Sequence, residues 1–315
     1  MDSEGSRRIV LYVGRVTRGH LRLLLIADTH LGLPGFFSRF ERALQPAFRG
    51  EVDLVVHGGD VFFRSQVKPA LVLRAFEPLK RLADSGVPVV VVPGNHERSA
   101  IPYPLFAAHP GIYIFDAPRT FLLNVCGFAV AIAGFPNERD QIRERFASLL
   151  ERTGWRSASS DLRLLCLHQT VEGSTVGPAG YVFRSAPDVI PGRAIPPGFA
   201  AVLTGHIHRH QVLAADLRGH ALAAPVFYPG STERTSTAER YEPKGFVTMT
   251  IAVDASPGGR VREWTFHQLS PAEAPLASIL SDQAPRGVAS EMWTRTATHR
   301  RGPIRVPRSP AGSGS

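Results

Sequence analysis

Leu23-Leu24-Leu25-Ile26-Ala27-Asp28-Thr29-His30 is a strand-length apolar run that ends in an Asp-x-His pair. Four further runs rich in Leu, Val and Ile lead into polar clusters of the same kind, which are Gly59-Asp60, Gly94-Asn95-His96-Glu97, His168 and Gly205-His206-Ile207-His208. In an open α/β sheet, the carboxyl ends of the strands border the crevice in which ligands bind. The five clusters therefore predict one polar site at the edge of a sheet.

The spacing of apolar residues predicts an α/β fold. Strands over 21–26, 52–57 and 87–92 alternate with helices over 36–48 and 69–85, the order typical of βαβ units. The second helix is expected to pack through its large apolar residues, which are Leu71, Leu73, Phe76, Leu79 and Leu82. Farther along the chain we expect a helix over 139–152, a long Gly- and Pro-rich loop over 173–197, and strands over 112–115, 121–125, 128–133, 162–167, 200–203, 211–214, 221–228, 245–253 and 260–267.

The composition is that of a globular protein outside the membrane. The 315 residues are 43% hydrophobic, enough for a sizeable core, and contain no apolar run long enough to span a bilayer. The N-terminus lacks the apolar core of a secretory signal, and the two cysteines lie within apolar runs, so we expect a cytoplasmic protein. The formal net charge of +9 favours a polyanionic partner such as DNA. Residues 1–20 are expected to form a tail or an extra edge strand, and residues 271–315 a disordered basic tail.

Aspartate and histidine side chains without cysteine are typical ligands of a divalent metal such as Mn, Fe or Zn. Hydrolysis of a phosphoester needs a strong nucleophile and neutralisation of phosphoryl charge, and two ions roughly 3.5–4 Å apart provide both. Two ions at that distance need a shared anionic ligand together with neutral ones, and the chain offers Asp28 and Asp60 among several histidines and Asn95. Each cluster alone is compatible with a structural role, but all five in this order indicate a two-metal hydrolase.

The five clusters, from Leu21 to His208, resemble the ordered motifs of the calcineurin-like metallophosphoesterases. The resemblance implies a sandwich of two facing mixed β-sheets flanked by helices, in a domain that covers 21–270. A later stretch is similar to the segment that closes the nuclease core of the SbcD-type DNA-repair exonucleases; it reads Tyr228-Pro229-Gly230-Ser231-Thr232-Glu233-Arg234-Thr235-Ser236, followed by Lys244-Gly245-Phe246. This second similarity favours DNA cleavage as the activity.

The resemblance also implies a role for each polar residue. One metal, with Mn expected before Fe or Zn, would have three ligands of its own: Asp28, His30 and His208. The second metal would have three others: Asn95, His168 and His206. Asp60 would bridge the two ions. His96 would lie beside them and protonate the leaving oxygen or stabilise the phosphoryl charge, work that suits an imidazole because it exchanges protons near neutral pH.

The chain departs from the family pattern in three places. Many members carry an acid three positions after the bridging Asp, where this chain has Phe63, so the group that orients His96 is left open. Glu97 stands where Asp is usual. The SbcD-type nucleases continue into a DNA-capping domain and a segment that binds an ATPase partner of the SbcC type, whereas only about 45 residues follow Pro271 here. This departure puts the ATPase partner in doubt.

Two enzymatic functions are compatible with these observations. The first is a nuclease or DNA phosphodiesterase that acts in repair or processing, and the second is a phosphoesterase for a small nucleotide or another small phosphoester. A non-catalytic scaffold is disfavoured because every expected ligand is present. Arg184 and Arg234 are candidates for contacting substrate phosphate, since guanidinium binds phosphate through two hydrogen bonds. His57 and His210 are interpreted as hydrogen-bonded structural residues rather than ligands.

Overall fold

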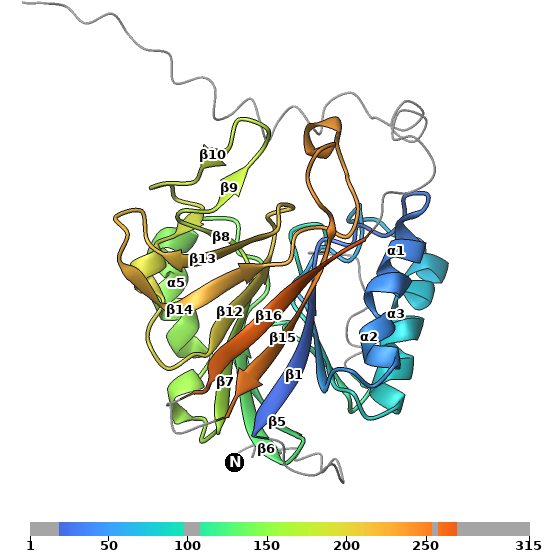
Figure 1. Cartoon of the computed structure of the whole chain (residues 1–315), viewed down its shortest axis with the longest axis horizontal. Helices are drawn as coiled ribbons and strands as arrows, with labels where there is room; N and C mark the ends of the chain where they lie inside the picture. The colour runs from blue at the N-terminus through green and yellow to red at the C-terminus, as the bar shows by residue number, and fades with distance from the viewer. Residues whose placement is uncertain (1–18, 98–107, 254–257, 270–315) are drawn as a thin grey trace, which may run out of the picture. The chain divides into compact units, whose positions relative to one another are not determined.

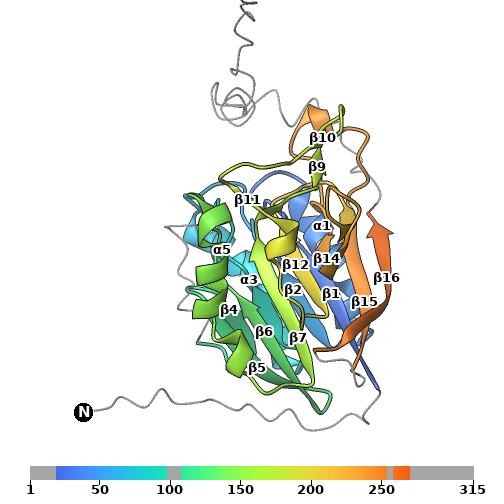
Figure 2. The ribbon, with the colours of Figure 1, turned by 90° about the vertical axis from the view of Figure 1, so that its left-hand side faces the viewer.

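The computed structural model describes residues 19–97, 108–253 and 258–269 (Figures 1 and 2). All of these residues belong to one compact unit. The expectations for 1–18 and for 271–315 lie outside the described residues. Of the expected N-terminal segment only Gly19 and His20 are described, and His20 opens the first strand.

The first sheet is mixed and has the order β16-β15-β1-β2-β3-β4. Its four parallel strands are β1 (His20–Ile26), β2 (Leu54–His57), β3 (Val89–Val91) and β4 (Ile112–Ile114). Strand β15 (Gly245–Ala252) runs antiparallel to β1, and β16 (Arg260–Gln268) runs antiparallel to β15.

The second sheet is also mixed and has the order β13-β14-β12-β7-β6-β5. Its parallel strands are β6 (Phe128–Gly134), β7 (Leu162–His168), β12 (Ala201–Gly205) and β14 (Ala221–Tyr228). The antiparallel edge strands are β5 (Arg119–Val125) and β13 (Gln211–Ala215). The two mixed sheets confirm the fold class predicted from the sequence.

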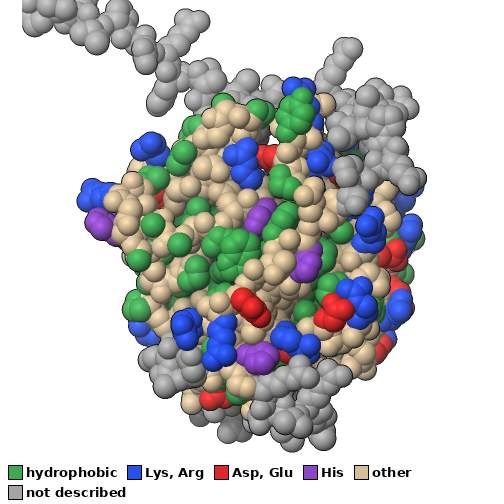
Figure 3. Space-filling view, in the orientation of Figure 1, with side chains coloured by type: hydrophobic (Ala, Val, Ile, Leu, Met, Phe, Trp, Pro, Cys, Tyr) green, Lys and Arg blue, Asp and Glu red, His purple; other side chains and the backbone are tan. Residues whose placement is uncertain are grey.

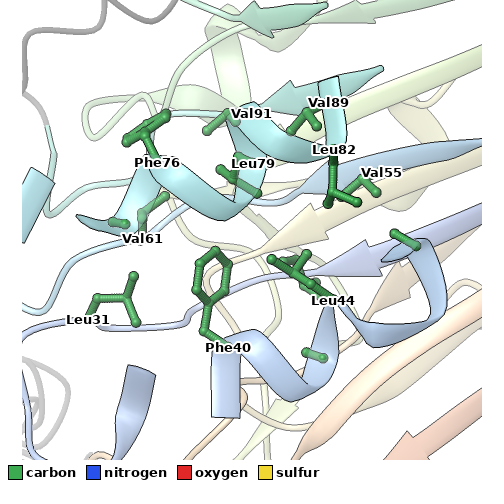
Figure 4. Close-up of a cluster of buried hydrophobic side chains, with 14 of the residues drawn as sticks. Leu31, Phe40, Leu44, Val55, Val61, Phe76, Leu79, Leu82, Val89 and Val91 are labelled. Carbon is green, nitrogen blue, oxygen red and sulfur yellow. The ribbon is translucent and has the colours of Figure 1, made fainter. Parts of the chain in front are cut away.

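Helices cover the outer face of each sheet, so that the chain forms four layers (Figures 1 and 2). The first sheet is covered by α1 (Phe36–Ala43), α2 (Gln45–Phe48) and α3 (Pro69–Asp84). Their apolar side chains pack against those of the sheet in the cluster shown in Figure 4. Helix α5 (Ile142–Arg152) covers the second sheet.

Strand β1 shows why its sequence is a continuous apolar run. Leu21, Leu23 and Leu25 face the core between the two sheets, whereas Leu24 and Ile26 face the helices. Successive side chains of a strand point to opposite faces, and a strand buried on both faces therefore has no polar alternation. The same burial positions the end of β1 deep inside the molecule.

Three local expectations are corrected by the structure. The helix expected over 36–48 is two helices, because Pro46 lacks an N–H group and begins a new turn. In α3, Val72 is buried where Leu73 was expected to pack, and Leu73 is 63% exposed. The helix expected from residue 139 begins at Ile142, after Gln141 in a left-handed conformation.

The segment expected as one long loop over 173–197 contains short elements, as does the chain just before it. They are β8 (Thr170–Val171), β9 (Thr175–Val176), β10 (Tyr181–Val182), β11 (Val189–Ile190) and the 3₁₀ turn η2 (Gly192–Ala194). Two other 3₁₀ turns are η1 (Trp155–Ser157) and η3 (Thr237–Glu239). Among the described residues, no helix has both the length and the apolar character needed to cross a bilayer.

Candidate metal centre

The ends of parallel strands in both sheets bring the predicted site residues together. Strands β1, β2 and β3 of the first sheet are followed directly by five of them: Asp28, His30, Asp60, Asn95 and His96. Strand β7 of the second sheet ends at His168, and β12 leads into His206 and His208. Since His168 and Gly205 are partners in the register of β7 and β12, the two late clusters lie side by side.

The first predicted ligand group is compact. The ligand atoms of Asp28, His30 and His208 lie within 4.8 Å of one another. Nε2 of His208 is 3.0 Å from Nε2 of His30 and 4.0 Å from an Asp28 carboxylate oxygen. These are the three residues that the sequence assigns to one metal.

The second predicted group surrounds the side-chain oxygen of Asn95. This oxygen lies 3.1 Å from Nε2 of His168 and 3.0 Å from Nδ1 of His206. Asp60 lies between the groups, because its ligand atoms fall within 4.8 Å both of those of His30 and His96 and of those of Asp28 and His168. That position is the one expected of a bridging carboxylate.

The orientation of His168 tests whether this centre fits a cation. Its Nδ1 lies 2.7 Å from the carbonyl oxygen of Gly58, which can only accept, so Nδ1 carries the proton. In the neutral ring, the lone pair of Nε2 then faces the Asn95 and Asp60 oxygens, at 3.1 and 3.5 Å. Electron-pair donors that face one another at such distances need either a proton or a metal ion between them. The donor set therefore fits a divalent ion.

The group of Asp28, His30 and His208 also directs a ring lone pair at the position where a cation would lie. His208 Nδ1 lies 3.0 Å from a carboxylate oxygen of Glu239, which leaves the lone pair of Nε2 directed at the centre. The buried Nδ1 of His30 has no hydrogen-bond partner among the described residues. The Nε2 of His30, 3.0 Å from that of His208, is the ring nitrogen that faces the other predicted ligands.

Burial and neighbouring charges shift the pKa values of the centre. Burial and the charge of His208 lower the pKa of His30 well below its usual range, and burial and His168 lower the pKa of His206 to about 3. Neutral imidazole is the form that binds metal. Burial alone would also lower the pKa of His168, but the Asp60 carboxylate outweighs it and raises that pKa to about 9. Without an ion the His168 ring therefore holds a proton beside Asp60, and a bound metal ion would take the place of that proton.

Backbone strain is concentrated at the centre. Six non-glycine residues in the described part of the chain have a positive φ, and four of them are predicted ligands: Asp28 (50°), His30 (44°), Asp60 (51°) and His206 (83°). A left-handed conformation costs a non-glycine residue on the order of 1–3 kcal/mol and persists only where the surroundings impose it. Strain of this kind gathers at functional sites, and periodicity in the sequence gives no sign of it.

The glycines of the motifs allow the two sheets to approach each other at the centre. A Cβ on Gly58 would lie 2.9 Å from the backbone nitrogen of Gly205. A Cβ on Gly94 would collide with the carboxylate of Asp60. Glycine at these positions leaves room for the backbones to bring predicted ligands of both sheets close together.

A backbone carbonyl orients His96. Its Nδ1 donates to the carbonyl oxygen of Phe63 at 2.7 Å, and its Nε2 lies 3.8 Å from a carboxylate oxygen of Asp60. The question raised by the missing acid at position 63 therefore has an answer: the backbone of Phe63 supplies the acceptor. The buried carboxylate of Glu97 accepts hydrogen bonds from the N–H groups of Phe62 and Gly94, at 2.9 and 2.8 Å, which holds the loops after β2 and β3 together.

His57 connects the loops that follow β1 and β2 through buried hydrogen bonds. Its Nδ1 accepts a hydrogen bond from the N–H of Gly59 at 3.2 Å, so Nε2 carries the proton and donates to the hydroxyl of Thr29 at 3.1 Å. The Thr29 hydroxyl in turn donates to the carbonyl of Val61 at 3.0 Å. His57 is thus a buried, hydrogen-bonded residue, and His210 donates to the carbonyl of Tyr228 at 2.9 Å while stacking on a phenylalanine ring.

The two arginines proposed for phosphate binding lie in different surroundings. Arg184 is exposed just beyond β10. Arg234 has an 11% exposed side chain that donates to the carbonyl groups of Arg240 and Glu242, a placement that favours packing, and its contact with phosphate stays a prediction. Sequence reasoning did not identify Arg139, an exposed residue whose guanidinium donates to the carbonyl of Asn95 at 2.8 Å.

Comparisons with known proteins agree with this geometry. A family model described as calcineurin-like phosphoesterase matches residues 21–210. The DNA double-strand break repair protein Mre11 of Saccharolobus solfataricus is 24% identical over 210 residues, which cover 62% of this chain and 51% of that protein. Mre11 of Methanosarcina mazei is 27% identical over 251 residues, which cover 74% and 36%. The chain thus spans about half the length, or less, of these curated relatives.

A solved structure shows the same fold. The crystal structure of TT1561 of Thermus thermophilus matches 79% of this chain and 99% of that chain, with a TM-score of 0.52 and 15% sequence identity. The family model covers more than half of the chain, and the matched residues include every strand end that carries a predicted ligand. The chain belongs to the calcineurin-like phosphoesterase family.

Proposed function

We propose that the chain is a two-metal phosphodiesterase that cleaves DNA, with manganese as its working ion. The observation that carries the proposal is the orientation of two rings, those of His168 and His208. In each ring the outer nitrogen, Nδ1, is hydrogen-bonded to a protein acceptor, and the inner nitrogen, Nε2, faces other predicted ligands. The proposal assigns one ion to Asp28, His30 and His208. It assigns the other ion to Asn95, His168 and His206. Asp60 is shared by both ions.

Two divalent ions, when bound, would neutralise the charge of the phosphoryl oxygens and make water a better nucleophile. The remaining work falls to the chain itself. His96 is held through Nδ1 by the Phe63 carbonyl, so its Nε2 faces the centre and delivers a proton to the departing oxygen. Its backbone N–H also donates to an Asp60 carboxylate oxygen at 3.0 Å, which couples the position of the acid to that of the bridging ligand.

DNA is favoured as the substrate by the relatives and by the charge of the chain. Both Mre11 proteins are named for DNA double-strand break repair, and the chain carries a net charge of +9. On the face of β14 to β16, however, the basic side chains of the described residues are dispersed among acidic and apolar ones (Figure 3). We therefore assign the first phosphate contact to the rim of the metal centre, where Arg139 is exposed beside Asn95.

The test is a comparison of substrates. Linear single- and double-stranded DNA, a cyclic dinucleotide and bis-p-nitrophenyl phosphate are offered to the metal-free chain with Mn, Mg or Zn added. The proposal expects Mn-dependent cleavage of at least one form of DNA. Rapid hydrolysis of the cyclic dinucleotide with no DNA cleavage would favour the alternative function on a small phosphoester. Co-purification would test for the SbcC-type ATPase partner that the sequence puts in doubt.

A further inference from the structure

The segment between β14 and β15 contributes more to the metal centre than the similarity of its motif indicates. It is the orange loop at the top of Figure 1, and it contains η3. One carboxylate oxygen of Glu239 lies 3.0 Å from Nδ1 of His208 and also accepts a hydrogen bond from the Thr235 hydroxyl at 2.9 Å. The outer nitrogen of a predicted metal ligand is therefore bound to an acid 31 residues later in the chain.

A buried lysine holds that acid in place. Nζ of Lys244 lies 2.7 Å from the second carboxylate oxygen of Glu239, and the lysine side chain is 1% exposed. The same Nζ donates to the backbone carbonyl of His208 at 2.9 Å. Both the ring and the backbone of His208 are thus fixed by one ion pair. A buried ammonium is costly unless it is paired and hydrogen-bonded, and this one has both kinds of partner.

We propose that Glu239, held by Lys244, is the positioning residue of His208 and sets the affinity of the ion that His208 binds. The proposal rests on the two-metal centre proposed above. A carboxylate on the outer nitrogen fixes the tautomer, prevents rotation of the ring and makes the inner nitrogen a better electron donor. Glu239 is in none of the candidate ligand groups and contacts the ring of His208, so its effect on a bound ion would pass through His208.

Glu242 provides a matched control. It lies on the same loop, within 3.3 Å of the same Lys244 nitrogen, and also pairs with Arg209 at 2.9 Å. Of these two acids, Glu239 is the one within hydrogen-bond distance of the His208 ring. If the loop acts only by closing the fold, Glu239→Gln and Glu242→Gln should have similar effects on metal binding.

The test measures Mn²⁺ binding to the full chain by calorimetric titration and by the EPR signal of the two bound ions. Glu239→Gln keeps the shape of the side chain but loses its charge. One of the two ions should bind roughly 10–100-fold more weakly, while the other keeps its affinity. Glu242→Gln should bind both ions as the parent does. Unchanged affinities in Glu239→Gln, or equal losses in both variants, would overturn the role of Glu239.

Two further observations separate the possible failures. A parent chain that binds fewer than two ions would overturn the proposed metal centre, and this inference with it. If Glu239→Gln does not fold, ¹H–¹⁵N spectra of the Zn-loaded parent labelled in histidine decide the question. They should show the proton of His208 on Nδ1, and a proton on Nε2 would overturn the inference.

Discussion

The loops after the first-sheet strands and the late loop between β14 and β15 hold predicted ligands in different ways. In the first sheet the ligands follow β1, β2 and β3 on tight turns, and backbone groups of neighbouring loops fix them. The N–H of Asp28 donates to the carbonyl of Gly59, and the N–H of His96 donates to the carboxylate of Asp60. In the second sheet, His208 is fixed by the side chains of Glu239 and Lys244, which belong to a different loop. The ligands on the first-sheet turns depend on glycine and strained backbone. His208 depends on an ion pair, Glu239 with Lys244, that lies far from it in the sequence.

This difference predicts different responses to mutation. A change in a loop of the first sheet disturbs several ligands at once, because the loops after β2 and β3 share the carboxylate of Glu97. In the proposed centre, a change in the late loop should disturb His208 alone and leave the second ion in place.

Asp60→Asn should have the largest effect, because it removes a charge shared by both ions and weakens the hold on His168. We expect both ions to be lost and DNA cleavage to fall to background. Metal analysis and cleavage assays check this, with Asp84→Asn, a change at an exposed acid paired with Lys80, as the control. Two retained ions with activity within tenfold of the parent would show that Asp60 is not the bridge.

His96→Ala should leave both ions bound and lower turnover by roughly 10²–10⁴-fold, the usual contribution of a general acid. The ring is oriented by a backbone carbonyl of the first sheet, so its loss should leave the ligands of the second sheet unaffected. The loss should be large for DNA, whose leaving alkoxide needs a proton, and small for bis-p-nitrophenyl phosphate. Equal losses on both substrates would favour stabilisation of phosphoryl charge, and loss of an ion would make His96 a ligand.

The sequence was sufficient to predict the elements whose signals are local. The buried strands, the two mixed sheets and the convergence of the strand ends followed from apolar runs and from the resemblance of the motifs. The Phe63 carbonyl could not be predicted, because any residue has a carbonyl and only the fold directs this one at His96. Glu239 was missed for a different reason: the acid that fixes His208 lies on another loop, and spacing does not show which side chains meet across a fold.

His57 should make stability depend on pH through the first sheet alone. Burial lowers the pKa of His57 from 6.5 to about 3, so the folded chain keeps the ring neutral while the unfolded chain protonates it. The unfolded state therefore binds the extra proton between these values, and stability falls as pH decreases from 6.5 towards 3. This group alone contributes a slope of about 1.4 kcal/mol per pH unit.

Denaturant unfolding of the metal-free chain between about pH 7 and pH 4 measures that slope. The variant His57→Gln removes the proton uptake while an amide can still donate to Thr29. Its unfolding free energy should be lower than that of the parent near neutral pH and should approach it at the acid end of this range. A difference that stays constant over the range would show that His57 is not kept neutral by the fold.

Arg139 gives the smallest expected effect and connects the two regions, because it follows β6 of the second sheet and donates to the Asn95 carbonyl in the first. If its guanidinium binds a phosphate that flanks the cleaved bond, Arg139→Gln should raise KM for an oligonucleotide about tenfold, the loss of one charge-assisted contact. The slope of log affinity against log salt should fall by about 0.7–0.9, the value for one phosphate contact. Hydrolysis of bis-p-nitrophenyl phosphate, which has no flanking phosphate, should not change. The control is Arg156→Gln, a change at an exposed arginine paired with Glu151, which should leave KM and the salt dependence as in the parent. Equal losses on the oligonucleotide and on the small diester would mean that Arg139 acts by holding the backbone of Asn95, and it would then join the residues that position ligands rather than substrate.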